Sequence, residues 1–155
     1  AHPADMPICS LEDLPDGALI ALDPGTKTIG VAACGASRGL ATPVETIKRT
    51  KFTQDAERVF QLMDERQVVG VIMGLPVNMD GTEGARVQSV KAMARNLLRL
   101  RDFPLVFQDE RLSTFEAEEK LIEAGVRREK RKAVIDAHAA ANILQSALDR
   151  LVHLG

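Results

Sequence analysis

The chain has no tryptophan, no tyrosine and only five phenylalanines among its 155 residues. Proteins that bind single-stranded nucleic acid usually stack bases on aromatic side chains, so this shortage disfavours that class. It favours recognition of a nucleic-acid backbone and its shape over the reading of bases. The two cysteines, Cys9 and Cys34, form neither a disulfide framework nor a zinc-ligand spacing, and we expect two reduced thiols.

Long apolar runs are also missing. None approaches the roughly 20 residues that cross a bilayer, and acids and prolines stand where a signal peptide needs a basic start and an apolar stretch. We therefore expect a cytoplasmic protein with no membrane partner. The net charge of −2 excludes a polycation that binds nucleic acid through charge alone.

The length predicts one domain with a proper core. Residues 1–17 contain three prolines and little periodicity, so we interpret them as an N-terminal tail before a folded domain at 18–155. Short apolar runs predict five strands, at 19–22, 27–33, 40–47, 68–73 and 105–108. Helical periodicity predicts four helices, at 53–67, 84–101, 113–125 and 133–152.

The order of these elements is β-β-β-α-β-α-β-α-α. The first three strands, joined by short turns, predict an antiparallel meander. The later alternation of strands and helices predicts parallel strands with right-handed crossovers. The fold class is therefore α/β, with a mixed five-stranded sheet flanked by helices.

Three acidic residues lie at positions typical of metal ligands. Asp23 and Glu110 each follow an apolar run, and Asp136 lies on the apolar face of the last predicted helix with Ala140 and Ile143. Isolated carboxylates are costly in such places unless a cation neutralises them. Carboxylates gathered from two strand ends and a helix suit Mg²⁺ or Mn²⁺, which points to metal-assisted phosphate chemistry.

Each acid also has an ordinary interpretation. Asp23 precedes a glycine turn, which could equally cradle a phosphate as in actin-like ATPases. Asp109 competes with Glu110 for the same role, and Asp136 could pair with Arg111 in a salt bridge. The segment Ser113-Thr114-Phe115-Glu116 matches a capping box, so we expect the third helix to begin there.

Other polar segments are candidates for substrate contact. The loop from Gly74 to Gly84 follows a predicted strand, at the end where open α/β sheets bind ligands. His138 is interpreted as a solvated or interface residue and not as a ligand. A basic run precedes Asp136, and it is either a solvated loop or a phosphate contact. Its members are Arg127, Arg128, Lys130, Arg131 and Lys132.

Four ordered motifs resemble the YqgF family, also called RuvX, over Leu19–Leu151. The motifs are Leu22-Asp23-Pro24-Gly25-Thr26-Lys27-Thr28-Ile29-Gly30-Val31-Ala32, the loop 74–84, Asp109-Glu110-Arg111-Leu112-Ser113-Thr114, and Ile135-Asp136-Ala137-His138-Ala139-Ala140. The resemblance implies a ribonuclease H-like fold and a divalent-metal nuclease of precursor 16S rRNA or of Holliday junctions. Pro24 departs from the apolar residue that many members carry, which should not remove a ligand.

The resemblance also implies that Asp23, Glu110 and Asp136 are the catalytic metal ligands. We infer two-metal phosphodiester hydrolysis, in which Asp23 bridges both ions and the other two acids hold one each. Seven residues are predicted to hold substrate: Lys27, Asn78, Arg111, Arg127, Arg128, Arg131 and Lys132.

The predicted partners are structured RNA or branched DNA, with pre-ribosomal particles and a homodimer as further expectations. Processing of the 5′ end of precursor 16S rRNA is favoured through the resemblance, and junction resolution is the alternative. A non-catalytic nucleic-acid-binding module is the second alternative, and an ATP-binding fragment of the actin-like class is the third.

Overall fold

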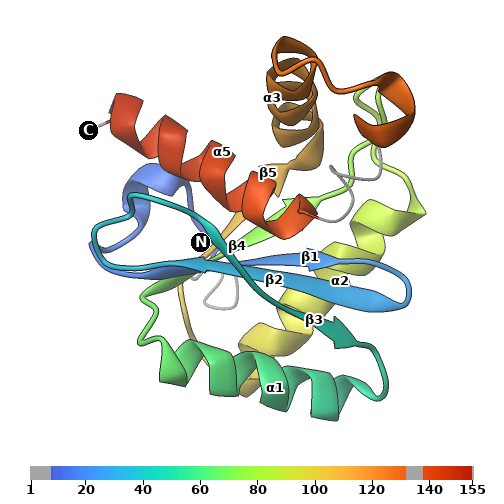
Figure 1. Ribbon diagram of the computed structural model, residues 1–155. Helices are drawn as coiled ribbons and strands as arrows, with labels where there is room; N and C mark the ends of the chain where they lie inside the picture. The colour runs from blue at the N-terminus through green and yellow to red at the C-terminus, as the bar shows by residue number, and fades with distance from the viewer. Residues whose placement is uncertain (1–7, 132–137, 155) are drawn as a thin grey trace.

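The computed structural model describes residues 8–131 and 138–154. These residues form one five-stranded sheet with the strand order β3-β2-β1-β4-β5 (Figure 1). The strands are β1 (Leu19–Pro24), β2 (Thr28–Cys34), β3 (Thr42–Lys48), β4 (Gly70–Leu75) and β5 (Leu105–Asp109). The helices are η2 (Leu11–Asp13), α1 (Phe52–Glu65), α2 (Ala85–Leu100), α3 (Glu110–Glu123) and α5 (Ala139–Leu154).

The sheet is mixed, as the sequence predicts. Strand β2 pairs antiparallel with both β1 and β3, whereas β1 with β4 and β4 with β5 are parallel pairs. The carboxyl ends of β1, β4 and β5 therefore lie at one edge of the sheet. The register places Leu22 beside Met73 and Gly74 beside Gln108, so the residues that follow them meet at this edge.

Helices cover both faces of the sheet. In Figure 1, α1 and α2 lie below the sheet and α5 crosses above it, with α3 beside α5. Side chains alternate between the two faces along each strand. In β1, Ile20 and Leu22 join the core with α1 and α2. Leu19 and Ala21 join the core under α5, where Ile143 is buried.

The segment before β1 packs against the sheet from residue 8 onward. Ile8 forms a parallel bridge with Leu105, and the backbone N–H of Cys9 donates to the Leu105 carbonyl at 2.9 Å. Leu14 is buried in the core under α5. Its side chain fills the space beside Gly70, where a Cβ would lie 2.7 Å from Leu14 Cδ2.

The capping-box prediction at Ser113 is wrong. Helix α3 begins at Glu110 with no loop after β5, and Asp109 is its N-cap. The Asp109 carboxylate accepts the Arg111 backbone N–H at 2.9 Å and so satisfies an orphan donor of the first turn. Ser113 is buried one turn into the helix, where its hydroxyl donates to the Glu110 carbonyl at 2.9 Å.

None of the helices in the described residues combines the length and the apolar character that a bilayer crossing requires. The final helix is described from Ala139, and three residues of its predicted inner face, Ala140, Ile143 and Ala147, are buried. The predicted helical start at 133 lies outside the described residues.

Candidate active site at the carboxyl edge of the sheet

Asp23 lies near the carboxyl end of β1, the central strand of the sheet. Strand alternation puts its side chain on the same face as Leu19 and Ala21, which is the face that α5 covers. A Cβ added to Gly30, its antiparallel partner, would lie 3.6 Å from the Asp23 Cβ and 3.5 Å from the Ala140 Cβ. Asp23 therefore sits between the sheet and the start of α5.

Glu110 reaches the same place from the first turn of α3. Its carboxyl group lies near that of Asp23 and is affected by it. Burial raises the pKa of Glu110 to about 9, and the proximity and negative charge of Asp23 act in the same direction. The guanidinium of Arg86 lowers the pKa of Glu110, but it does not outweigh these effects. Two carboxyl groups thus share one partly buried site.

Asp109, the rival of Glu110, faces elsewhere. Its carboxylate forms a two-pronged ion pair with Arg111, with Nε and Nη2 donating to Oδ2 at 3.0 and 2.6 Å. These hydrogen bonds hold the pKa of Asp109 below its usual value. Its charge is therefore already neutralised, which favours Glu110 as the partner of Asp23.

Gly74 allows this arrangement, although the sequence pattern marks it only as the end of a strand and the start of the candidate loop 74–84. A Cβ at this position would lie 2.7 Å from Glu110 Oε1 and 2.6 Å from Ile143 Cδ1. Any side chain on residue 74 would therefore press on the Glu110 carboxyl group or on α5. A glycine between two apolar residues at the end of a buried strand is the signal that could have identified it.

The Asp23–Glu110 pair fits a divalent cation. Partly buried like charges need either a proton or a cation between them, and carboxylate oxygens are hard donors that suit Mg²⁺ or Mn²⁺. Within residues 8–131 and 138–154, no group of three or more Asp, Glu, His or Cys side chains is placed to hold a metal. The third predicted ligand, Asp136, lies outside the described residues, as does Lys132.

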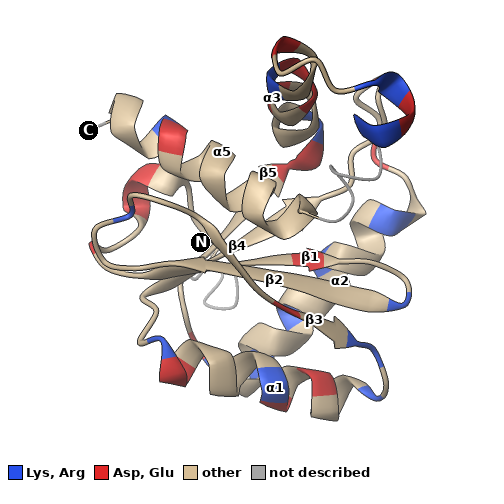
Figure 2. Cartoon of the chain, in the orientation of Figure 1, with Lys and Arg blue, Asp and Glu red and all other residues tan. Residues whose placement is uncertain are grey.

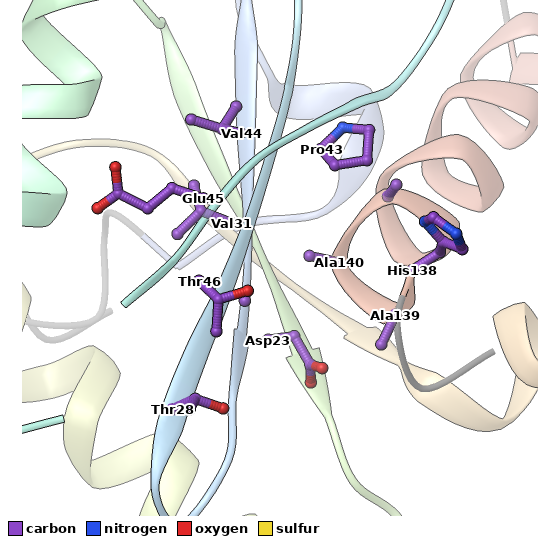
Figure 3. A pocket seen from close by; sticks show the side chains of 12 residues that line it. Asp23, Thr28, Val31, Pro43, Val44, Glu45, Thr46, His138, Ala139 and Ala140 are labelled. Carbon is purple, nitrogen blue, oxygen red and sulfur yellow. The ribbon is translucent and has the colours of Figure 1, made fainter. Parts of the chain in front are cut away.

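A cavity of about 250 Å³ opens beside Asp23, between the β2–β3 strands and the start of α5 (Figure 3). The hydroxyl groups of Thr28 and Thr46 and the ring of His138 line it, together with Pro43 and the first alanines of α5. His138 is exposed, in agreement with its interpretation as a solvated residue. The cavity is where a substrate group could reach the Asp23 carboxylate.

The other predicted substrate-binding residues differ in exposure and in their side-chain partners. Lys27 is exposed in the turn between β1 and β2, and Arg127 and Arg128 are exposed after α3. Arg131 lies 3.5 Å from Glu118 in an ion pair. Asn78 is exposed in the loop after β4, where its amide donates to the Thr82 hydroxyl at 3.0 Å.

Arg111 connects α3 to that loop. Its Nη1 donates to the Met79 carbonyl at 3.4 Å, while its other nitrogens contact Asp109. Arg111 and Arg131 are thus engaged with acids, whereas Lys27, Arg127 and Arg128 belong to no ion pair within the described part of the chain.

A family model described as "Holliday junction resolvase" (RuvX) matches residues 17–150. Two curated relatives are each named "Putative pre-16S rRNA nuclease". The relative from Rhodopseudomonas palustris is 58% identical over 140 residues, covering 90% of this chain and 86% of its own. The relative from Rhodobacter capsulatus is 54% identical over 139 residues, covering 90% and 87%.

Two solved structures share the fold. A structure of Thermus thermophilus RuvC in complex with a Holliday junction substrate has a TM-score of 0.54 at 12% identity, covering 87% of this chain and 96% of its own. The yeast mitochondrial Holliday junction resolvase Ydc2 has a TM-score of 0.50 at 13% identity, covering 97% and 86%. At these identities the likeness concerns the fold alone, and it confirms the ribonuclease H-like architecture that the sequence predicts.

Proposed function

The chain belongs to the RuvX family, and on that premise we propose that it hydrolyses phosphodiester bonds in the 5′ region of precursor 16S rRNA. The nuclease class is the one that the family and its curated relatives carry. The substrate is proposed from the relatives, which are named for pre-16S rRNA and align over about nine-tenths of this chain. Such a substrate would place the protein in the cytoplasm, in contact with pre-ribosomal particles.

The observation that carries the proposal is the pairing of Asp23 with Glu110. A partly buried carboxyl pair destabilises the fold unless a proton or a cation offsets its charge, and carboxyl groups perturbed in this way are typical of functional sites. The pair sits at the carboxyl ends of parallel strands, which is the usual ligand edge of an open α/β sheet. An exposed basic rim lies next to it, at Lys27 and Arg86.

We propose that Asp23, Glu110 and Asp136 hold a divalent cation, Mg²⁺ or Mn²⁺. When bound, such an ion activates water and offsets the charge that develops on the scissile phosphate. The residues of the chain contribute positioning. Asp23 lies in β1, a rigid central strand, and Glu110 lies in the first turn of a helix that follows a strand directly.

The cavity beside Asp23 is proposed to hold the nucleotide next to the cleavage point. Its hydroxyl groups, from Thr28 and Thr46, can bond to sugar or phosphate oxygens, and its apolar wall of Pro43 and α5 alanines can contact a sugar ring. Lys27, Asn78, Arg111, Arg127, Arg128, Arg131 and Lys132 remain proposed contacts to the flanking backbone. Phosphate contacts of this kind position a substrate and carry no base specificity.

A second candidate substrate is a four-way DNA junction. The description of the family model favours it. A junction resolvase cuts two strands symmetrically, so this function predicts a homodimer.

The test is a cleavage assay in Mg²⁺ or Mn²⁺ that compares an RNA carrying the precursor 16S 5′ end with a synthetic four-way junction. The variant Asp23→Asn is the negative control, and it should lower cleavage by about 10³-fold or more while circular dichroism shows an unchanged fold. Asp109→Asn is the matched control, because it removes a neighbouring acid that is already paired with Arg111.

Metal-dependent cutting of the RNA that Asp23→Asn abolishes supports the proposal. Cutting of the junction alone makes the protein a resolvase and contradicts the rRNA substrate. Cutting of neither, with binding retained, means a non-catalytic module. Cleavage by Asp23→Asn at the wild-type rate overturns the catalytic assignment.

A further inference from the structure

Two arginines close a small pocket under the turn between β1 and β2, on the side of the sheet where α2 lies. Arg49 follows β3 and Arg86 lies in the first turn of α2. They line the pocket together with Gly25, Thr26 and Ser89, and no acidic residue of the described chain lines it.

Each arginine is anchored to the turn by the backbone. Arg49 Nη1 donates to the Gly25 carbonyl at 2.5 Å, and Arg86 Nη2 donates to the Pro24 carbonyl at 3.3 Å. A guanidinium has five N–H donors, so both groups keep donors that the described residues do not use. The contacts fix where the guanidinium groups lie without neutralising their charge.

Most of the other arginines that the structure holds in place differ in this respect; Arg38, bound by the carbonyls of Pro15 and Gly17, is an exception among the described residues. Five arginines are in ion pairs with carboxylates within the described ranges: Arg58, Arg101, Arg111, Arg131 and Arg150. Arg49 and Arg86 form no such pair within those ranges, although both are held in place. Two fixed positive charges that line one pocket, with no acid of the described chain in its lining, favour an anion from outside the chain.

The pocket is close to the catalytic edge. Pro24, whose carbonyl accepts the hydrogen bond from Arg86, directly follows Asp23. The positive charge of Arg86 also lowers the pKa of Glu110. Figure 2 shows Lys and Arg at the β1–β2 turn, after β3 and at the start of α2, around one end of the sheet. Lys27 and Lys48 lie beside the two arginines, since the Arg49 backbone N–H donates to the Lys27 carbonyl at 2.9 Å and Lys48 pairs with Thr28 in the sheet.

We propose that Arg49 and Arg86 bind a backbone phosphate of the nucleic acid, one that flanks the phosphate to be cut. Planar guanidinium groups match phosphate oxygens through paired N–H donors. The substrate strand would then pass from the cavity beside Asp23 across the β1–β2 turn, with its two ends held on opposite sides of the sheet edge. This inference rests on the proposed nuclease function.

The experiment measures equilibrium binding of an RNA stem and of a four-way junction over a range of salt concentrations. All proteins carry Asp23→Asn, so that no cleavage occurs. The test variant adds Arg49→Gln and Arg86→Gln. The control variant adds Arg95→Gln and Arg99→Gln, which remove the same charge from exposed positions farther along α2.

The proposal predicts that the test variant binds about 10-fold more weakly at low salt and that the slope of log affinity against log salt falls by about 1, as for one lost phosphate contact. The control variant should keep both values close to those of the parent. Equal thermal unfolding of the three proteins checks that the turn still folds.

Three results would overturn the inference. If test and control variants bind alike, the arginines hold no phosphate. The test variant could keep the salt slope of the parent, and the protein with both arginine substitutions and an intact Asp23 could show a lower kcat and no other change. In that case the arginines position the turn and bind no phosphate. If the parent binds neither nucleic acid, the proposed function fails, and the phosphate site fails with it.

Discussion

Two acidic centres lie next to each other at the end of β5 and are built in opposite ways. At the first, Asp109 meets Arg111, which lowers the pKa of the carboxyl group and neutralises its charge. At the second, Glu110 meets Asp23, and burial with a like charge raises the pKa of Glu110 to about 9. Of these two consecutive residues, Asp109 has its charge neutralised by an arginine, whereas Glu110 lies beside a second acid.

The difference shows how burial and charge partners separate an acid with a structural role from one proposed to bind a cation. The Asp109–Arg111 pair stabilises the start of α3 and needs nothing further. The Asp23–Glu110 pair costs stability in the metal-free protein, and a cation would remove that cost.

Among variants that leave Asp23 in place, the largest effect is expected from Gly74→Ala, which disturbs the Asp23–Glu110 pair without changing any acid. The new methyl group would lie 2.7 Å from Glu110 Oε1, so the carboxyl group or α5 must shift. A displacement of about 1 Å at a catalytic group can cost ~10²-fold in rate. Steady-state cleavage kinetics should show this loss in kcat, with a decrease in stability of about 1–3 kcal/mol.

Gly35→Ala is the control for that variant, because no atom lies within 4 Å of a Cβ at residue 35. It should cleave like the wild type. A Gly74→Ala protein with wild-type kcat would mean that cleavage does not depend on the position of Glu110. The Asp23–Glu110 pair would then have no demonstrated role in cleavage.

The second prediction concerns pH. Glu110 has a folded-state pKa of about 9, above its ordinary value of 4.5. Between these values the folded state binds a proton that the unfolded state has released, so the stability of the metal-free protein falls as pH rises. The other shifted carboxyl groups have lowered pKa values and titrate below this window: Glu45, Asp64, Asp80 and Asp109.

Glu110→Gln cannot titrate and should remove this dependence. In the presence of a chelator, the Tm of the wild type should fall relative to that of Glu110→Gln as the pH rises from 5 to 9. In a chain of this size, each kcal/mol of lost unfolding free energy lowers Tm by about 2–4 °C. Thermal scans at several pH values measure the difference. Parallel Tm curves for the two proteins would show that Glu110 is ionised throughout.

The smallest effect is expected from Asp109→Asn, at the Asp109–Arg111 pair. Asparagine caps a helix about as well as aspartate, so the loss is that of one partly exposed ion pair. Chemical denaturation should show a decrease in the free energy of unfolding of about 1 kcal/mol or less. The cleavage rate should stay within about 3-fold of the wild type, because so small a loss of stability leaves the fold intact. A loss of activity as large as that of Asp23→Asn would reverse the roles of Asp109 and Glu110.

Much of the fold was predictable because the strands and helices carry regular periodicity. Five apolar runs gave the five strands, and the change from short turns to helical connections gave the mixed pairing that is confirmed. The start of α3 was not predicted correctly. The capping-box pattern at Ser113 is local, whereas the true cap, Asp109, belongs to the strand end before it.

The candidate site was predictable in its parts but not in its pairing. Asp109 and Glu110 are adjacent, and only the immediate passage from β5 into α3 decides which one turns toward Asp23. The contact of Glu110 with Gly74 joins residues far apart in the chain, as does the packing of Ile8 on Leu105. Such long-range contacts leave no trace in local periodicity.

The measurement that tests the account most directly is calorimetric titration of Mn²⁺ into the wild type, Glu110→Gln and Asp109→Asn. At pH 7, in two buffers of different ionisation enthalpy, the wild type and Asp109→Asn should bind the ion with release of about one proton, because the folded protein holds that proton until the ion displaces it. Glu110→Gln should bind far more weakly and release none. Equal binding by the wild type and Glu110→Gln, or a loss of binding in Asp109→Asn, would contradict the assignment of the Asp23–Glu110 pair as the metal centre.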